Sequence, residues 1–267
     1  MSETQIHPSS IVEPGAKLGV GVEIGPFCVV GRDVVLGDGA YLQSHITVEG
    51  ITRIGARARI HPHAAIGGPP QHRTYKGEPT TLTIGDDCEI RESVIIHRGT
   101  DFGGGETVIG DGCSFLSAAH VAHDCRIADG AMVGHNGGVA GHAIVDEGAI
   151  IGSYAAIHQF CRIGAYAFIG GCAAVANDVI PYGSALGNHA SLGGLNIIGL
   201  KRAGLDRKTI HAMRAAYNEI FLGGDMEKRR FAERVDGVAK TYADVAEVMR
   251  IIAFIRAGAK RALMGAR

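Results

Sequence analysis

Two histidines and a carboxylate stand close together near the middle of the 267-residue chain, at His120, His123 and Asp124. An imidazole has an unperturbed pKa of about 6.5, so a neutral histidine that can accept a proton is available near pH 7. A carboxylate beside it can orient the ring, and the pair then suits general-base catalysis. No serine or cysteine stands here in a triad-like context, which favours direct group transfer over a covalent intermediate.

The repeat that contains these residues predicts the fold. An aliphatic or aromatic residue recurs at every sixth position, with two interruptions, in 26 hexads between Ile6 and Val175. A period of six fits neither an amphipathic helix nor an alternating strand, and is typical of a parallel β-helix. The fifth place often holds Ala or Cys, as a narrow prism requires of a second inward side chain. Five of the six cysteines stand there, so we expect buried free thiols rather than disulfides or metal ligands.

Three hexads per coil would place residues 18 apart on the same face of the β-helix. Gly141 and Gln159 would then lie above His123, and His142 would lie above Asp124. We therefore expect these five residues to form one polar cluster at a turn. Gly141 could offer an unhindered backbone N–H to a developing oxyanion.

Two insertions and a change of pattern define the rest of the chain. Residues 68–83 are polar and proline-rich, and residues 101–107 contain three consecutive glycines. Insertions in a repeat fold form loops, often beside the binding face. After residue 190 the hexads give way to helical periodicity at 206–223, 226–238 and 243–256. The predicted organisation is a β-helix at 1–190 and a C-terminal helical domain at 191–267.

Composition argues against several classes of protein. The formal net charge of −1 gives no sign of a nucleic-acid partner. No apolar run is long enough to cross a bilayer, and the first residues lack the basic and apolar regions of a secretory signal. We therefore expect a cytoplasmic protein that neither binds nucleic acid nor inserts into membranes.

Several motifs together give the chain a family resemblance. They lie at residues 90–93, 96–100, 120–125, 140–142, 158–161, 187–190 and 196–202. With them, nearly the whole chain resembles the bacterial UDP-N-acetylglucosamine acyltransferases that begin lipid A biosynthesis. The resemblance implies an all-β left-handed parallel β-helix with a small C-terminal α-helical domain, assembled as a homotrimer with sites between subunits. It also implies transfer of a (R)-3-hydroxyacyl chain from acyl carrier protein to the glucosamine 3-position of the UDP-sugar, with no cofactor or metal.

The resemblance assigns roles to individual residues. It implies that His123 is the general base, that Asp124 orients it, and that the Gly141 N–H stabilises the thioester oxyanion. The residues implied to bind the sugar, the acyl chain or the nucleotide are Gln71, His97, His120, His142, His158, Gln159, Gly171, His189, Asn196 and Arg202. Glycine at position 171 leaves room in the acyl tunnel, so a long-chain hydroxyacyl donor is expected.

Four residues depart from the family pattern. His72 stands where a carboxylate is common, Thr74 where lysine is common, Ile198 where glutamate is common, and Ala203 where a second arginine is frequent. These positions fall near the expected sugar and uridine contacts. The alternative of a 3-amino sugar acceptor, which would give an amide product, therefore stays open.

Two other enzymes on the same scaffold also stay open. A γ-carbonic-anhydrase-like zinc hydratase would need three histidines around an open metal, and the candidates are His120, His123 and His142. An acetyl-CoA sugar acetyltransferase would share the fold and the histidine base. A carrier-protein donor would be helped by basic residues of the C-terminal domain, namely Arg229, Arg230, Lys240, Lys260 and Arg261.

Overall fold

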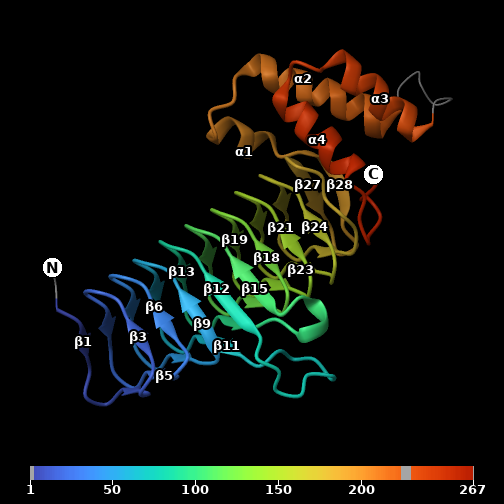
Figure 1. Ribbon diagram of the computed structural model, residues 1–267. Helices are drawn as coiled ribbons and strands as arrows, with labels where there is room; N and C mark the ends of the chain where they lie inside the picture. The colour runs from blue at the N-terminus through green and yellow to red at the C-terminus, as the bar shows by residue number, and fades with distance from the viewer. Residues whose placement is uncertain (1–2, 224–229, 267) are drawn as a thin grey trace.

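The structure, a computed structural model, describes residues 3–223 and 230–266. Most of the chain winds as a left-handed parallel β-helix of triangular section, and a group of helices covers its C-terminal end (Figure 1). The left hand is an exception to the right-handed crossover rule for parallel strands. The fold class expected from the six-residue repeat is confirmed.

Three sheets form the faces of the prism. The first contains, in spatial order, β1 Gln5–Ile6, β4 Glu23–Ile24, β7 Tyr41–Leu42, β10 Arg59–Ile60, β13 Glu89–Ile90, β16 Ser114–Phe115, β19 Met132–Val133, β22 Ile150–Ile151, β25 Phe168–Ile169, β27 Gly183–Leu186 and β28 Ser191–Leu195. The second contains β2 Ile11–Val12, β5 Val29–Val30, β8 Thr47–Val48, β11 Ala65–Gly68, β14 Ile95–His97, β17 His120–Val121, β20 Gly138–Val139, β23 Ala156–Ile157 and β26 Ala174–Val175. The third contains β3 Lys17–Leu18, β6 Val35–Leu36, β9 Ile51–Ile54, β12 Thr81–Ile84, β15 Glu106–Ile109, β18 Arg126–Ile127, β21 Ile144–Val145 and β24 Arg162–Ile163.

The strand register confirms three hexads per coil. Gln5 pairs with Glu23, and His120 pairs with Gly138, in both cases 18 residues on. The aliphatic first place and the small fifth place point inward. Val121 and Cys125 are both fully buried, as are most residues at these places. The five cysteines at the fifth place are free and buried as expected, whereas Cys172, one place earlier, is exposed.

The corners of the prism depend on one unusual backbone conformation. The fourth place of each hexad lies at a corner, and there the residue commonly has a positive φ, for example 59° at Asp124 and 62° at His142. Few residues other than glycine adopt this left-handed region freely. Among the described residues, the fold nevertheless repeats it at fifteen that are not glycine, because each turn must bend the same way to close the coil. Asp124, His142 and Phe160 therefore stand in one column, one per coil.

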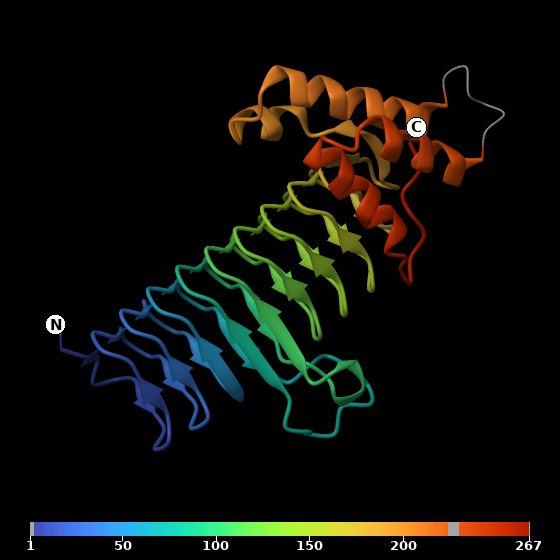
Figure 2. The same cartoon turned by 45° about the horizontal axis from the view of Figure 1, so that its top comes forward.

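Both insertions leave the prism at the same edge, between the second and third sheets. The first follows β11, and the second follows β14 and contains the short 3-10 helix η1 Asp101–Gly103. They project side by side from the long body of the molecule (Figure 2). The predicted loops are thus confirmed, although the last residues of each predicted range, such as Thr83 and Thr107, belong to strands β12 and β15.

The C-terminal residues fold as helices, in broad agreement with the predicted periodicity. The helices are α1 Ile197–Arg202, α2 Arg207–Tyr217, the π-helix η2 Asn218–Leu222, α3 Phe231–Thr241 and α4 Ala246–Arg256. Asp206 caps α2 by accepting a hydrogen bond from the Thr209 N–H, and Gly223 follows η2 with a positive φ. The predicted helix at 226–238 begins outside the described residues. Among the helices that the structure describes, none is long and apolar enough to cross a membrane.

Polar contacts dock the helices onto the last coils. Arg162 pairs with buried Asp178 at 2.7 Å, and its guanidinium lies 4.2 Å from the centroid of the Phe254 ring. Arg250 on α4 pairs with Glu147 at 2.6 Å. The domain boundary at residue 190 stays a prediction, and β28 still pairs with β27 beyond it, in an antiparallel sense.

Candidate functional site

Asp124 is held in place by hydrogen bonds from two parts of the chain. Nδ1 of His123 lies 2.7 Å from Asp124 Oδ2, and the Thr100 hydroxyl donates to the same oxygen at 2.5 Å. The Thr100 N–H donates to Oδ1 at 2.8 Å. A carboxylate can only accept, so the neutral ring carries its proton on Nδ1 and leaves the Nε2 lone pair free. His123 and Asp124 are only 9% and 7% exposed, so the pair has a fixed orientation.

The second insertion is built to close over this carboxylate. Thr100 stands at its start and Thr107 at its end, where the Thr107 hydroxyl accepts the Asp124 N–H at 2.8 Å. A Cβ on Gly103 would lie 2.1 to 2.4 Å from the Asp124 carboxylate atoms. Only glycine therefore lets η1 approach so closely. The insertion both supplies hydrogen-bond donors and excludes water from one side of the dyad.

The protonation of the site follows from these contacts. Burial alone would raise the pKa of the Asp124 carboxyl, but hydrogen bonds from His123 and Thr100 outweigh it and lower that pKa below its ordinary value. Desolvation lowers the pKa of His97 to about 4, and it also lowers the pKa of His120 and of His142. The imidazoles of His97, His120 and His142 are therefore neutral near pH 7. Asp124 forms its direct hydrogen bond with a different ring, that of His123.

Gly141 stands directly beside the ring of His123. A Cβ on Gly141 would lie 2.6 Å from His123 Cε1 and 2.9 Å from Nε2. The Gly141 N–H has no hydrogen-bond acceptor in the described part of the chain. Position 141 is the third place of its hexad, where Pro26 and Pro62 stand in other coils. The coil does not need this N–H, so it is free to bind a ligand.

A cavity of about 320 Å³ opens onto the dyad from the second sheet. Its lining residues are Gln71, His120, Ala122, His123, Gly138, Val139, Ala140, Gly141, Ala156 and Ile157. Four predicted site residues, Gln71, His120, His123 and Gly141, thus meet in one place. His97 lies behind His120, with 3.4 Å between His97 Nδ1 and His120 Nε2, and is buried.

Aromatic rings surround the other side of His123. The His72 ring meets it edge-on at 5.2 Å between centroids, and the His142 ring does so at 5.1 Å. Phe102 from the second insertion packs on His72 at 4.6 Å. His72 also bonds Thr74 through Nδ1 at 2.9 Å. The departure at His72 therefore lies within the site, beside the proposed base.

The three histidines expected for a zinc hydratase do not come together as one ligand set. Within the described residues, the side chains whose ligand atoms lie within 4.8 Å of one another are His123, Asp124 and His142, while His120 pairs with His97. Asp124 Oδ2 is already engaged by Thr100 and His123. A metal bound there would displace these hydrogen bonds, so the geometry suits a proton-transfer dyad better.

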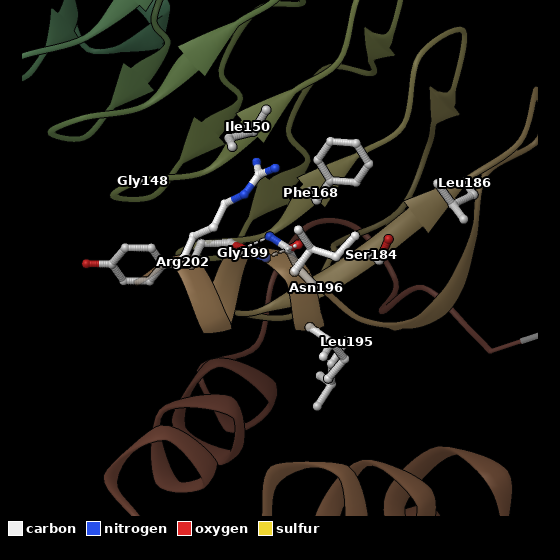
Figure 3. A pocket seen from close by; sticks show the side chains of 12 residues that line it. Gly148, Ile150, Phe168, Ser184, Leu186, Leu195, Asn196, Gly199 and Arg202 are labelled. Carbon is white, nitrogen blue, oxygen red and sulfur yellow. Dashed lines mark hydrogen bonds between the residues drawn. The ribbon is translucent and has the colours of Figure 1, made fainter. Parts of the chain in front are cut away.

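A second and larger cavity, of about 660 Å³, lies on the first sheet (Figure 3). It contains the predicted residues Asn196 and Arg202 and the departing residue Ile198. The other lining residues are Gly148, Ile150, Tyr166, Phe168, Ser184, Leu186, Leu195, Ile197 and Gly199. Asn196 caps α1 by accepting from the Gly199 N–H at 3.0 Å and donates to the Tyr166 carbonyl at 3.1 Å. Ala203 ends the same helix.

Seven predicted site residues line neither cavity, namely Asp124, His97 and His142, described above, and His158, Gln159, Gly171 and His189. Gln159 follows the expected stacking order, but its side chain is exposed, and its carbonyl accepts from Arg261. His158 is exposed as well and also contacts Arg261. Gly171 and His189 are exposed at turns. Gln159 therefore keeps the expected place in the coil above Gly141, where the Phe160 N–H donates to the Gly141 carbonyl, and its part in the cluster around His123 stays a prediction.

The structure adds residues that the hexad arithmetic missed. Thr100 and Gly103 belong to an insertion, where counting by eighteen fails. Tyr166 and Phe168 line the larger cavity from places that look like ordinary strand and corner positions. The run from Thr100 to Gly105, with its consecutive glycines next to a family motif, was the available signal for a close approach.

Comparisons with known proteins identify similar acyltransferases. A model of the family described as UDP N-acetylglucosamine O-acyltransferase, domain 2, matches residues 178–264. The chain is 54% identical to the acyl-[acyl-carrier-protein]–UDP-N-acetylglucosamine O-acyltransferase of Bartonella quintana, covering 98% of this chain and 94% of the relative. It is 57% identical to the protein of that name from Mesorhizobium japonicum, covering 97% and 91%.

Solved structures give the same result. LpxA from Acinetobacter baumannii superposes with a TM-score of 0.92 at 36% identity, covering 97% of this chain and 99% of that one. The UDP-N-acetylglucosamine O-acyltransferase (LpxA) of Moraxella catarrhalis gives 0.91 at 37% identity, with the same coverage. Identity above one half over nearly the full length of curated relatives leaves no doubt about kinship, and the chain belongs to the acyl-[acyl-carrier-protein]–UDP-N-acetylglucosamine O-acyltransferase family.

Proposed function

We propose that this chain transfers a (R)-3-hydroxyacyl group from acyl carrier protein to the glucosamine 3-hydroxyl of UDP-N-acetylglucosamine, the first step of lipid A biosynthesis. The observation that carries the proposal is the buried His123–Asp124 pair beside the unused Gly141 N–H, in a chain of this family. No cofactor takes part. The base, its orienting carboxylate and an oxyanion donor are the groups that direct acyl transfer requires.

The geometry supports the following sequence of events. Nε2 of His123 takes the proton from the 3-hydroxyl as its oxygen attacks the thioester carbonyl. Asp124 holds Nδ1–H and stabilises the imidazolium that forms, and the Gly141 N–H donates to the oxyanion of the tetrahedral intermediate. When the intermediate collapses, the C–S bond breaks and the imidazolium returns its proton to the leaving thiolate. Gln71 and His120 line the cavity where the sugar would lie.

We assign the nucleotide to the larger cavity with Asn196 and Arg202, and His189 to its neighbourhood. Gly171 is left for the acyl chain. A Cβ on Gly171 would meet only the Ser153 carbonyl at 3.3 Å, so the residue leaves space, which supports a long-chain donor. His72 beside His123 keeps the alternative open in which a 3-amino sugar is acylated to an amide.

One assay tests the reaction and its alternatives. Purified protein is incubated with hydroxyacyl carrier proteins of several chain lengths, with acetyl-CoA, and with the 3-hydroxy and 3-amino UDP-sugars, and products are identified by mass. We expect the ester of a long-chain hydroxyacyl group. An amide product alone would replace the acceptor, and acetyl transfer alone would replace the donor. Absence of every acylated sugar would contradict the proposed function.

We infer a homotrimer with shared sites, and the placement of the two cavities supports it. The cavity with His123 lies on the second sheet and the cavity with Arg202 on the first, so they open on different faces of one prism. This placement suits a substrate bound between two neighbouring chains. Closed cyclic assemblies provide such a pairing at every interface.

The described cysteines are all free, which supports a reducing cytoplasmic location.

Mixed trimers test the shared site. His123→Ala and Arg202→Ala are each expected to lose activity when expressed alone. If random trimers form from equal amounts of both, about one quarter of the sites combine an intact His123 with an intact Arg202 from the neighbour. We expect activity to recover toward that fraction on co-expression. If each site lay within one chain, the mixture would stay as inactive as the single variants.

A further inference from the structure

After α4 the chain returns to the coil turn that carries residues 158–160. Nε of Arg261 donates to the Gln159 carbonyl at 3.0 Å, and Nη2 of Arg261 lies 2.6 Å from His158 Nδ1. Nζ of Lys260 lies 4.5 Å from the centroid of the Phe160 ring. Their partners distinguish Lys260 and Arg261 from Arg250 of the same domain, which pairs with the carboxylate of Glu147. Arg229 lies outside the described residues.

Lys260 ends a column of side chains that begins at the dyad. The Phe160 and His142 rings stack with centroids 4.5 Å apart and an angle of 8°. Nδ1 of His142 lies 3.8 Å from Asp124 Oδ2. The three residues occupy the same corner in successive coils. Desolvation is the main cause that lowers the pKa of His142, and the positive charge of Lys260 lowers it further. The Lys260 ammonium therefore acts electrostatically on His142, at the other end of the Phe160 ring stack.

These cations have neutral partners. In residues 3–223 and 230–266, no carboxylate forms an ion pair with Lys260 or Arg261. Lys260 faces a ring, and Arg261 faces a carbonyl and an imidazole nitrogen. Arginine can only donate, so His158 accepts through Nδ1 and carries its proton on Nε2. The result is a group of hydrogen-bond donors whose positive charge is not balanced by a carboxylate, and such a group suits a phosphate.

The distance from the dyad identifies which phosphate could reach this group. Neighbouring coils lie about 4.8 Å apart, so Lys260, beyond Phe160, lies roughly 14 Å from Asp124. About 13 bonds separate the thioester sulfur of a phosphopantetheine arm from its phosphorus, or roughly 16 Å when extended. About five bonds separate the 3-oxygen of a UDP-sugar from its nearer phosphorus, or roughly 6 Å. The separation fits the arm of the donor and exceeds the span of the acceptor.

We propose that Lys260, Arg261 and His158 form a phosphate-binding site for the phosphopantetheine arm of the acyl donor. The inference rests on the proposed acyl transfer and adds a subsite to it. Binding the phosphate here would extend the arm along the column and place the thioester carbonyl beside Gly141. The C-terminal segment would then take part in substrate binding, in addition to closing the end of the β-helix.

Small donors isolate this contact from carrier-protein docking. Hydroxyacyl-phosphopantetheine and hydroxyacyl-pantetheine differ only in the phosphate, and KM and kcat are measured for both with the full-length protein. We expect the wild-type protein to have the lower KM for the phosphorylated donor. Lys260→Met keeps an apolar stem on Phe160 and should raise that KM about 5- to 10-fold, as expected for loss of a charge-assisted contact in a partly exposed site.

Matched variants complete the test. Lys260→Arg should retain the preference for phosphate, and Lys208→Met, which removes an exposed charge from α2, should leave both constants unchanged. The KM for UDP-N-acetylglucosamine should not change in Lys260→Met. A rise in that KM alone would assign the site to the acceptor's pyrophosphate and overturn the proposal, as would equal use of both donors by the wild-type protein. Failure of acyl transfer itself would instead appear as no product from either donor.

Discussion

His123→Ala is expected to lose about 10²–10⁴-fold in kcat, the range that general-base catalysis supplies, while the protein keeps its fold. The residue stands at a turn and its side chain is not part of the inward-facing core, so its loss leaves the stacked aliphatic residues untouched. Initial rates of acyl transfer measure the effect, and circular dichroism with gel filtration checks the fold and assembly.

The matched control is His211→Ala, which removes an exposed imidazole from α2. It should retain wild-type rates. If His123→Ala transferred acyl groups as fast as the wild-type protein, another group would have to be the base. An effect on KM alone would also contradict the assignment, because a base acts on the transition state rather than on substrate binding.

Thr100→Val should give the second large effect, a fall of about 10- to 100-fold in kcat. A hydrogen bond to a charged group contributes about 1.5–3 kcal/mol, and its loss corresponds to a fall of this size. The substitution preserves shape but removes the hydroxyl that donates to Asp124 Oδ2. Asp124 would then hold His123 less firmly. A carboxylate with fewer donors also binds a proton more readily, so activity on the acid side of the pH profile should begin to fall at a higher pH.

Two variants separate this role from a merely structural one. Thr100→Ser keeps the hydroxyl and should restore most of kcat and the wild-type pH profile. Thr80→Val alters another buried threonine, whose hydroxyl has no hydrogen-bond partner in the described chain, and should change neither. A Thr100→Val protein with normal kcat and an unshifted pH profile would show that the dyad does not depend on this contact.

The six-residue period was enough to predict both the fold and the core of the site. Counting by eighteen placed Gly141 beside His123 and His142 beside Asp124, because the β-helix repeats one backbone geometry in every coil. The same count fixes the position of Gln159 in the next coil but not the direction of its long side chain, so its part in the site stays a prediction. The Gln159 carbonyl accepts a hydrogen bond from Arg261, a residue near the end of the chain that the repeat does not place.

Other parts of the site could not be predicted by counting residues along the repeat, because they lie outside it. Thr100 reaches Asp124 across 24 residues, a separation set by an insertion rather than by the coil. Asn196 and Arg202 were expected to join the site through the family resemblance, but the period says nothing about which face they would occupy. The structure places them at helix α1, beside a cavity on the first sheet rather than the second.

The common exit of both insertions has a consequence for how such a protein can change over time. Adding a residue within a strand would turn its aliphatic side chain from the inside of the prism to the outside. The two insertions avoid this, because each leaves at one edge and re-enters in register: Arg59 still pairs with Glu89 and Thr81 with Glu106, although neither separation is eighteen. Loop length at this edge is thus free to drift without disturbing the core. One of these loops holds Asp124, and the other brings His72 to the base. Changes in the length or sequence of the loops can therefore alter the choice of acceptor while the β-helix stays the same.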